Sequence, residues 1–383
     1  MNKKSIKKAS FYINTPMNRR TNTDKEITLA AHDAFRFHTT LPNYKATPLI
    51  QLPLLAKKYN IGNLYIKDES YRFDLTAFKV LGASYAIHIL LEEKPSISTF
   101  CTATDGNHGR AVAWAAKLFD KKAVVIVPRD TTPLRIHAIE QEGATVIQVD
   151  GTYDYACQFA AHISIENNWE LVQDMAWKGY ETIPAHIMAG YTTLFREITA
   201  ELASLSSSID IVFLQAGVGS FAGAGINYYL DMYGENRPKI IIVEPIEADA
   251  ILTSLQNGKI KTSNGNSETI MAGLNCGTPS LGAWNLLKNG IDASISIEDY
   301  YTEKAIRELY YPTGSDPRIY AGESGAAGLA GFIAIMNDPK LRHLQEILTI
   351  TSSSSILFIN TEGITDYNSF QQIIRKNDGG TPF

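Results

Sequence analysis

Short runs of apolar residues, rich in valine and isoleucine, recur along the chain and predict β-strands. The clearest runs are 64–67, 123–128, 144–150, 209–216, 239–245 and 354–360. Their apolar residues follow one another instead of alternating with polar ones, which is typical of strands buried on both faces of a parallel sheet. Helical segments separate the runs, so the pattern predicts the α/β class with helices covering the sheet.

One of these connections carries clear helix signals. Thr132 is a candidate N-cap, Pro133 suits the first helical position and Gly143 suits the end of the helix. The segment therefore predicts a helix that joins the strands at 123–128 and 144–150 as a β-α-β unit.

Composition adds an expectation about size and ligands. At 383 residues the chain is longer than one hydrophobic core usually grows, so we expect two lobes. With 45% hydrophobic and 20% charged residues, it is typical of a soluble globular protein. The net charge of -5 gives no electrostatic reason to expect nucleic acid or an anionic membrane as partner. A small polar or zwitterionic ligand is the better expectation.

Three cysteines, Cys101, Cys157 and Cys276, are scattered without the spacing of a disulfide framework or a metal site. The basic segment 1–8 is not followed by the apolar stretch of a secretion signal. No apolar run approaches the roughly 20 residues that span a bilayer. We therefore expect a cytoplasmic protein with no metal site.

Lys79 stands among residues that look buried, in the stretch AFKVLGAS at 77–84. The ordinary interpretation is a lysine whose aliphatic stem lies on apolar surface while its ammonium group reaches water. The alternative is a desolvated amine with a lowered pKa, able to form a Schiff base with a carbonyl compound. Other parts of the chain must decide between the two.

A glycine-rich stretch, LQAGVGSFAGAG at 214–225, leaves an apolar strand and enters a helix through Gly217, Val218, Gly219 and Ser220. Glycines let the backbone approach an anion, and a helix N-terminus offers unpaired N–H groups, so the stretch predicts a phosphate cradle. A dinucleotide site is the alternative, since Glu244 ends the next strand, but the G-x-G-x-x-x-G spacing departs from that fingerprint. A tight turn without a ligand is a third interpretation.

A polar loop, TATDGNHGR at 102–110, holds Asp105, Asn107 and His108 ahead of an alanine-rich helix. Alone, such a loop is most often a capped turn, and His108 is more typical of a structural histidine than of a catalytic one. Together with an amine and a phosphate cradle, Asn107 becomes a donor to a ring hydroxyl. These three elements describe a pyridoxal 5′-phosphate (PLP) site, with Lys79 as the residue that bonds to the cofactor.

The order of lysine, GNHG and glycine loop resembles the fold-type II PLP enzymes, the tryptophan synthase β family. Within that group the chain resembles the diaminopropionate ammonia-lyase family over nearly its whole length. The segments that carry the resemblance are KDESYRF, AFKVLG, TDGNHGR, VPRDTTPLR, VQDMAWKGYETIPAHIMAGY, GVGSFAGA, TIMAGLNCG, GESGAAGLAG and NTEGITDY.

The resemblance implies two doubly wound α/β lobes with PLP in the cleft between them, usually in a homodimer. The large PLP-binding domain would comprise 1–83 plus 194–383, and the small domain 84–193. It also implies α,β-elimination from 2,3-diaminopropionate, which gives pyruvate and two ammonia molecules.

The resemblance further implies roles for individual residues. Lys79 would remove the Cα proton, and Asp105 would stabilise the cationic β-nitrogen and act as base for the D-isomer. Asp174 would assist, although a capping or salt-bridge role is an equal alternative. Phe78 would lie beside the cofactor. Ser324 and Thr361 both match positions that offer a hydroxyl to the pyridine nitrogen, and the sequence does not choose between them.

Some positions depart from the family. Asp74 and Thr76 stand where the family commonly reads FGLNAFK, Ala83 replaces a common glycine, and the stretch from Lys79 to Asp105 is short. These changes could alter isomer preference or efficiency. A serine or threonine dehydratase, or another β-eliminating or β-replacing PLP enzyme, therefore stays open, as does a non-catalytic protein with the same fold.

Overall fold

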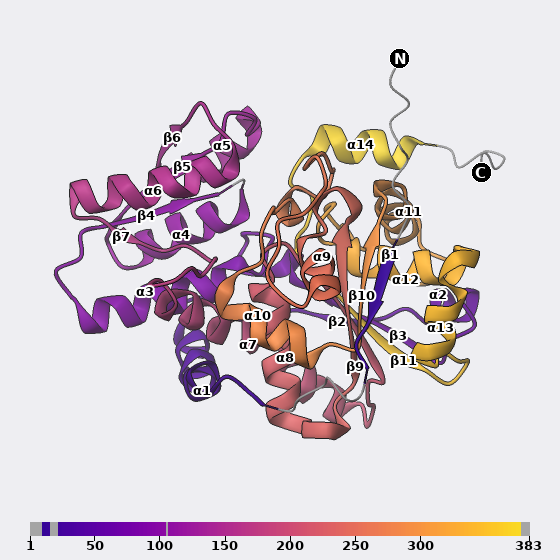
Figure 1. Cartoon of the computed structure of the whole chain (residues 1–383). Coiled ribbons are helices and arrows are strands. Elements are labelled where there is room, and N and C mark those ends of the chain that lie inside the picture. Colours follow the sequence, from indigo (N-terminus) through magenta and orange to yellow (C-terminus); the bar gives the residue numbers. More distant parts are fainter. Residues whose placement is uncertain (1–9, 16–21, 105, 377–383) are drawn as a thin grey trace, which may run out of the picture.

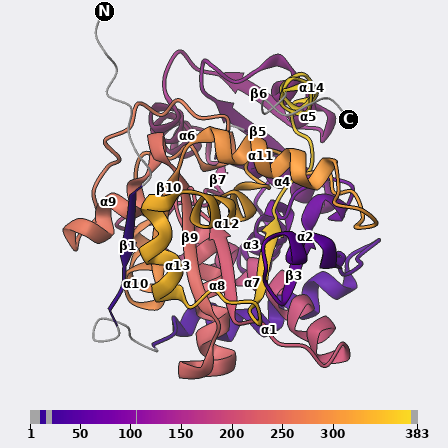
Figure 2. The same cartoon turned by 90° about the vertical axis from the view of Figure 1, so that its right-hand side faces the viewer.

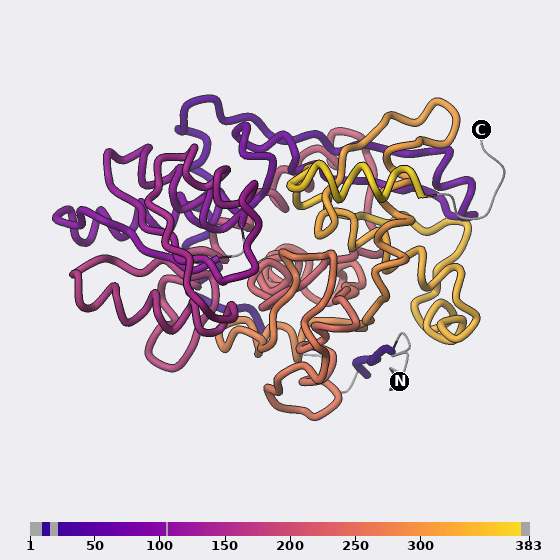
Figure 3. Tube along the Cα trace, turned by 90° about the horizontal axis from the view of Figure 1, so that it is seen from above, coloured from indigo at the N-terminus to yellow at the C-terminus, as the bar shows by residue number. Residues whose placement is uncertain are grey.

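The computed structural model describes residues 10–15, 22–104 and 106–376. Two sheets organise them, and the smaller sheet lies to one side of the larger in two perpendicular views (Figures 1 and 3). The larger sheet has the order β1-β10-β9-β8-β11-β3-β2, with β1 (Ser10–Ile13), β2 (Leu49–Gln51), β3 (Asn63–Asp68), β8 (Ile211–Gln215), β9 (Lys239–Pro245), β10 (Ala293–Ile297) and β11 (Ser355–Asn360). The smaller sheet has the order β6-β5-β4-β7, with β4 (Thr99–Ala103), β5 (Lys122–Val127), β6 (Thr145–Gln148) and β7 (Glu170–Leu171).

Helices connect the strands and cover the sheets. They are α1 (Lys25–Thr40), α2 (Pro53–Lys58), α3 (Lys79–Glu93), α4 (Asn107–Leu118), α5 (Pro133–Gln141), α6 (Tyr153–Asn167), α7 (Thr182–Ser204), α8 (Ser220–Tyr233), α9 (Ala250–Asn257), α10 (Leu281–Gly290), α11 (Asp299–Tyr310), α12 (Ala327–Asn337), α13 (Arg342–Leu348) and α14 (Tyr367–Arg375).

Alternate side chains of the buried strands enter two separate cores. Val212 and Leu214 of β8 pack with α3, α7, α8 and α10, in a core that continues to Phe100 of the smaller sheet. Ile211 and Phe213 of the same strand enter the opposite core, beneath α11, α12 and α13, which Figure 2 shows on the face turned to the viewer. The predicted α/β class is confirmed, because β8 is buried on both faces as its continuous apolar run indicated.

The six predicted strands are all present, and the predicted β-α-β unit is β5, α5 and β6 with parallel strands. Two details of the prediction were wrong. The edge strands β1 and β2 run antiparallel to their neighbours, so the larger sheet is mixed. The run at 144–150 is not buried on both faces, because β6 is an edge strand whose Thr145 and Gln148 are exposed.

The small sheet lies within the range 84–193 that the sequence predicts for the small domain. Both predicted boundaries fall inside helices, since residue 84 belongs to α3 and residue 193 to α7, and these helices pack against each other. The division into 1–83 plus 194–383 and 84–193 therefore stays our proposal. In the described part of the chain, no helix is both long and apolar enough to cross a membrane. Nor do the described residues group histidine, cysteine and carboxylate side chains as a metal ion requires.

A buried ion network precedes Lys79. The Arg72 guanidinium is 1% exposed and contacts the Glu69 carboxylate at 2.8 Å and the Glu197 carboxylate at 2.7 Å. Lys67 Nζ lies 2.6 Å from the same Glu197 carboxylate. Two cations thus share two carboxylates, which keeps each buried charge paired. The network ties the end of β3 to α7 and fixes the chain where the turn toward Lys79 begins.

The turn itself holds three residues in the left-handed region, Phe73 at φ 48°, Asp74 at φ 60° and Thr76 at φ 58°. Glycine and asparagine tolerate this conformation, whereas a β-branched threonine does so only at a cost. Two of the departures from the family sequence, Asp74 and Thr76, therefore lie where the backbone favours the glycine and asparagine that the family carries. Thr76 is held there because its carbonyl accepts a hydrogen bond of 2.8 Å from the Gly363 N–H.

Replacing Thr76 with asparagine should therefore stabilise the protein. We expect Thr76→Asn to raise the free energy of unfolding by about 1 kcal/mol, seen as a higher urea midpoint, because asparagine adopts positive φ more readily. Thr313→Asn is the matched control, because Thr313 is also half-buried but does not have a positive φ. Equal effects at the two positions would show that backbone strain is not the cause.

Candidate active site

A cavity of about 250 Å³ opens at the carboxyl ends of β8 and β11. It is lined by all the predicted site residues that the structure describes, namely Phe78, Lys79, Asn107, Asp174, Gly217, Val218, Gly219, Ser220, Ser324 and Thr361. Asp105 lies outside the described residues, between Thr104 and Gly106, which both line the cavity. Segments far apart in the sequence thus meet at one site, as expected where parallel strands end.

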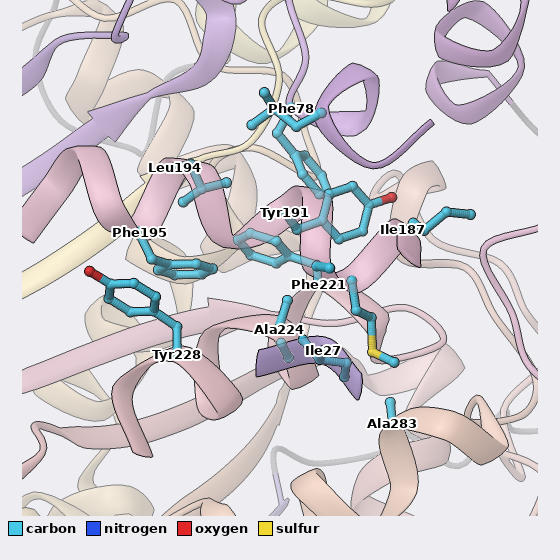
Figure 4. Packing of buried hydrophobic residues seen from close by; sticks show 14 of the residues in the cluster. Ile27, Phe78, Ile187, Tyr191, Leu194, Phe195, Phe221, Ala224, Tyr228 and Ala283 are labelled. Atoms are coloured by element: carbon cyan, nitrogen blue, oxygen red, sulfur yellow. The ribbon is translucent and has the colours of Figure 1, made fainter. Parts of the chain in front are cut away.

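Lys79 begins α3 and points its amine at a carboxylate. Its Nζ makes a hydrogen-bonded ion pair with Asp174 Oδ2, and the Lys79 side chain is 21% exposed. The preceding Phe78 packs against Tyr191 and Phe221, which lie beside it in Figure 4. Its ring centroid is 4.7 Å from that of Tyr191 and 4.6 Å from that of Phe221. This aromatic packing fixes the backbone from which the lysine extends.

The pKa expected for Lys79 from the sequence was wrong. Burial by itself lowers the pKa of the amine, but the Asp174 carboxylate outweighs burial and raises the pKa above its usual value. Burial likewise opposes the charge of Asp174, and the ammonium group of Lys79 lowers the pKa of that carboxyl. The two groups therefore form an ion pair rather than a neutral nucleophile beside apolar side chains.

His108 serves as a structural residue, in agreement with the sequence prediction. It is 4% exposed, and its Nε2 lies 2.9 Å from the Val172 carbonyl oxygen, to which it donates. Burial lowers the pKa of His108, so the ring is neutral. Its Nδ1 lies 3.9 Å from Asp174 Oδ2, but in this neutral form it carries no proton and makes no hydrogen bond to the carboxylate.

The glycine loop forms a cradle at the start of α8. Gly219 has φ 94°, and a Cβ at this position would lie 2.6 Å from Leu287 Cδ1. A Cβ at Gly217 would lie 3.0 Å from Cys276 Sγ, so a side chain there would crowd the cavity wall. The first N–H groups of α8 have no partner within the helix. This combination of close-approaching backbone and free donors fits the phosphate of PLP.

Glu244 does not support the dinucleotide alternative. Its carboxylate is fully buried and accepts hydrogen bonds of 2.7 and 2.8 Å from the N–H groups of Ile251 and Leu252, at the start of α9. It is not among the described residues that line the cavity. Glu244 therefore holds a helix start and does not face a ligand at this site.

Both candidate hydroxyls for the pyridine nitrogen reach the cavity. Ser324 Oγ accepts a hydrogen bond of 2.9 Å from the Gly273 N–H, and Thr361 Oγ1 accepts one of 3.0 Å from Gln215 Nε2. Each hydroxyl still has its own proton to donate. Ser324 and Thr361 thus both remain candidates.

Sequence reasoning missed several polar residues of the cavity, among them Arg135, Tyr153, Gln215 and Glu362. Gln215 is the last residue of β8, and Glu362 comes two residues after β11. Polar residues at the carboxyl ends of buried parallel strands were the signal that could have found these two. Arg135 and Tyr153 lie at the starts of α5 and α6, where polar residues are too common to be informative.

Comparison with known proteins supports this geometry. A family model described as "Pyridoxal-phosphate dependent enzyme" matches residues 40–353. The chain therefore belongs to the PLP-dependent enzymes of this fold, and PLP is its cofactor.

Within that class the chain belongs to the diaminopropionate ammonia-lyase family. It is 39% identical over 358 residues to "Diaminopropionate ammonia-lyase" of Escherichia coli (strain K12), with 89% of this chain and 90% of that protein covered. The protein of the same name from Salmonella typhimurium is 39% identical over 368 residues, with 90% and 91% covered. The crystal structure of the Escherichia coli enzyme "in complex with aminoacrylate-PLP azomethine reaction intermediate" matches with a TM-score of 0.91 and 38% identity, covering 96% of this chain and 97% of that one.

The cradle can be tested at Gly219. We expect Gly219→Val to weaken PLP binding at least about tenfold, because the new side chain meets Leu287 and distorts the loop at the phosphate. PLP affinity would be measured by titrating the cofactor-free protein. The matched control is Gly258→Val, at φ 68° with no atom within 4 Å of the added Cβ and outside the cavity. Equal affinity in the two variants would show that the loop is only a turn, and tight NAD binding would revive the dinucleotide alternative.

Proposed function

We propose that this protein catalyses the α,β-elimination of 2,3-diaminopropionate, which with one water gives pyruvate and two molecules of ammonia. The observation that carries the proposal is the Lys79–Asp174 ion pair, set in one cavity with the glycine cradle. Membership of the diaminopropionate ammonia-lyase family supports the choice of substrate.

The residues on the cavity wall divide among the parts of the cofactor. The loop from Gly217 through Val218 and Gly219 to Ser220 would hold the phosphate, and Lys79 would bond to the carbonyl carbon. Asn107 would donate to the ring oxygen, Ser324 or Thr361 would meet the ring nitrogen, and Phe78 would lie beside the cofactor. When bound, PLP withdraws electrons from the substrate's α-carbon and so makes its proton removable.

Lys79 and Asp174 would act together on that proton. In its neutral form the Lys79 amine accepts the Cα proton, and the Asp174 carboxylate stabilises the ammonium group that results. The Ser220 hydroxyl donates to the Asp174 main-chain carbonyl at 2.6 Å, which fixes Asp174 relative to the cradle. We propose that Asp174 has both of the roles that the sequence left open, and that it would assist through its salt bridge with Lys79.

Asp105 would favour departure of the β-nitrogen. An uncharged amine leaves carbon badly, so this nitrogen must depart from its protonated form, which a nearby carboxylate stabilises. Thr104 and Gly106, on either side of Asp105, both line the cavity. The role of Asp105 as base for the D-isomer belongs to the same proposal.

Product stoichiometry tests the proposed reaction. Protein loaded with PLP would be given the L- and D-isomers of diaminopropionate, and separately serine, while pyruvate and ammonia are measured. Two ammonia molecules for each pyruvate from diaminopropionate, with serine the poorer substrate, is the expected result. Preference for serine would replace the proposal with a dehydratase, and no turnover of any substrate would favour a non-catalytic role.

We also propose that the protein works in the cytoplasm as a homodimer. The scattered spacing of its three cysteines suits a reducing compartment. The homodimer is what its resemblance to fold-type II PLP enzymes implies. Sedimentation of the PLP-loaded protein would test the dimer, and a monomer at working concentration would contradict it.

A further inference from the structure

Glu362 is a carboxylate in the cavity whose two oxygens both accept hydrogen bonds. Oε1 accepts from the Ser324 N–H at 3.0 Å, and Oε2 accepts from Asn107 Nδ2. The side chain is well buried, with the residue 6% exposed. Its main chain is also fixed. The Gly322 N–H donates to the Glu362 carbonyl oxygen at 3.0 Å, and Glu362 forms an isolated antiparallel β-bridge with Ala77. Glu362 is therefore a rigid acceptor at the cavity wall.

This arrangement determines which way the Asn107 amide faces. The two ends of an asparagine amide are alike in shape, but only the nitrogen donates hydrogen bonds. A carboxylate beside it accepts and cannot donate, so it selects the orientation with Nδ2 toward Glu362. The nitrogen has a second hydrogen, which this contact leaves available to another acceptor.

We propose that Glu362 is a positioning residue for the cofactor: it orients Asn107 so that the remaining amide hydrogen donates to the ring oxygen of PLP. Asn107 begins α4 beside the small sheet, whereas Glu362 follows β11 of the large sheet. The contact therefore also sets the relation between the two sides of the cavity. The proposal depends on PLP binding and not on the identity of the substrate.

The surroundings of Glu362 act on its pKa in both directions, and their net effect is to raise it. Burial raises the pKa of Glu362 most strongly and Glu323 adds to the rise, whereas Arg135 and the hydrogen bond from Ser324 lower it. Arg135 and Glu323 both line the same cavity. Arg135 and the two hydrogen-bond donors, the Ser324 N–H and Asn107 Nδ2, oppose the protonation that burial favours.

Glutamine at this position separates orientation from packing. It has the shape of glutamate but only one acceptor end, so it cannot accept from both Ser324 and Asn107. We expect Glu362→Gln to weaken PLP binding about tenfold and to change the visible absorption spectrum of bound PLP, since a charge-assisted hydrogen bond is lost. Asn107→Ala should weaken PLP binding by a similar factor. The double variant should bind PLP little more weakly than either single variant, because the two residues act through one contact.

A second buried carboxylate and asparagine pair supplies the control. Asn360 Nδ2 donates to Asp68 Oδ1 at 2.7 Å, close along the chain to Glu362, and neither residue lines the cavity. Asp68→Asn should lower the melting temperature without changing PLP affinity or spectrum. Should Glu362→Gln not fold, Glu362→Ala tests the same loss.

Wild-type affinity and spectrum in Glu362→Gln would overturn the proposal. The proposal would also be overturned if the losses of PLP affinity in Glu362→Gln and Asn107→Ala multiplied in the double variant. Because these titrations use no substrate, either result leaves the proposed elimination untouched. Conversely, the absence of pyruvate formation would contradict the proposed elimination but not the proposed role of Glu362 in PLP binding.

Discussion

Alanine in place of Lys79 is expected to remove turnover, by on the order of 10³-fold or more, in a protein that still folds. The variant loses both the amine that bonds to PLP and the base for the Cα proton. It also leaves the Asp174 carboxylate without its ammonium partner, so some loss of stability should accompany the loss of activity. Pyruvate formation from diaminopropionate is the measurement, with circular dichroism to confirm the fold.

Lys94→Ala is the matched control for this variant. Lys94 follows the other end of α3, where its amine lies 3.3 Å from Glu170 and the side chain is 56% exposed. An exposed ion pair contributes little, so this variant should keep both its fold and its turnover. If Lys79→Ala retained more than about a tenth of the activity, Lys79 would not have the role proposed here.

Asn in place of Asp105 is expected to affect the two isomers of diaminopropionate differently. If Asp105 is the base for the D-isomer, Asp105→Asn keeps its size but removes that base, at a cost of about 10²–10⁴-fold in turnover. The L-isomer keeps Lys79 and should lose less. Pyruvate assays on both isomers measure the difference.

Asp174→Asn provides the contrast for Asp105. Because Asp174 contacts Lys79 directly, we expect Asp174→Asn to reduce turnover of the D-isomer and the L-isomer by similar factors. If Asp105→Asn left both isomers unaffected and serine were the better substrate, the assignment as an ammonia-lyase would fall. A dehydratase would then take its place.

The sequence predicted the buried part of the fold better than its edges. Residues 239–245 coincide with β9, because its centre, residues 240–243, is a continuous apolar run that is buried on both faces. The edge strand β2 has three residues, too few to show a pattern. At α5, Thr132 does occupy the N-cap, but its side chain makes no capping hydrogen bond, so the sequence located the helix start but not its contacts.

The site was predicted through its motifs, and what was missed depends on tertiary contacts. Lys79 and Asp174 are 95 positions apart, so the ion pair that reverses the pKa shift of the lysine could not be inferred from its neighbours. Glu362 follows directly after the predicted Thr361, yet its role depends on Asn107 from the other side of the cavity. The sequence showed Asp74 and Thr76 as departures from the family, but only the backbone φ angles show that both residues lie in the left-handed region.

The identity of the lysine that carries PLP tests the central claim most directly. Purified protein loaded with PLP would be reduced with borohydride, which fixes the cofactor to the lysine that bears it, and the labelled peptide would be sequenced. We predict a single label on Lys79. A label on another lysine such as Lys67, or a protein that remains colourless and unlabelled in excess PLP, would contradict the account.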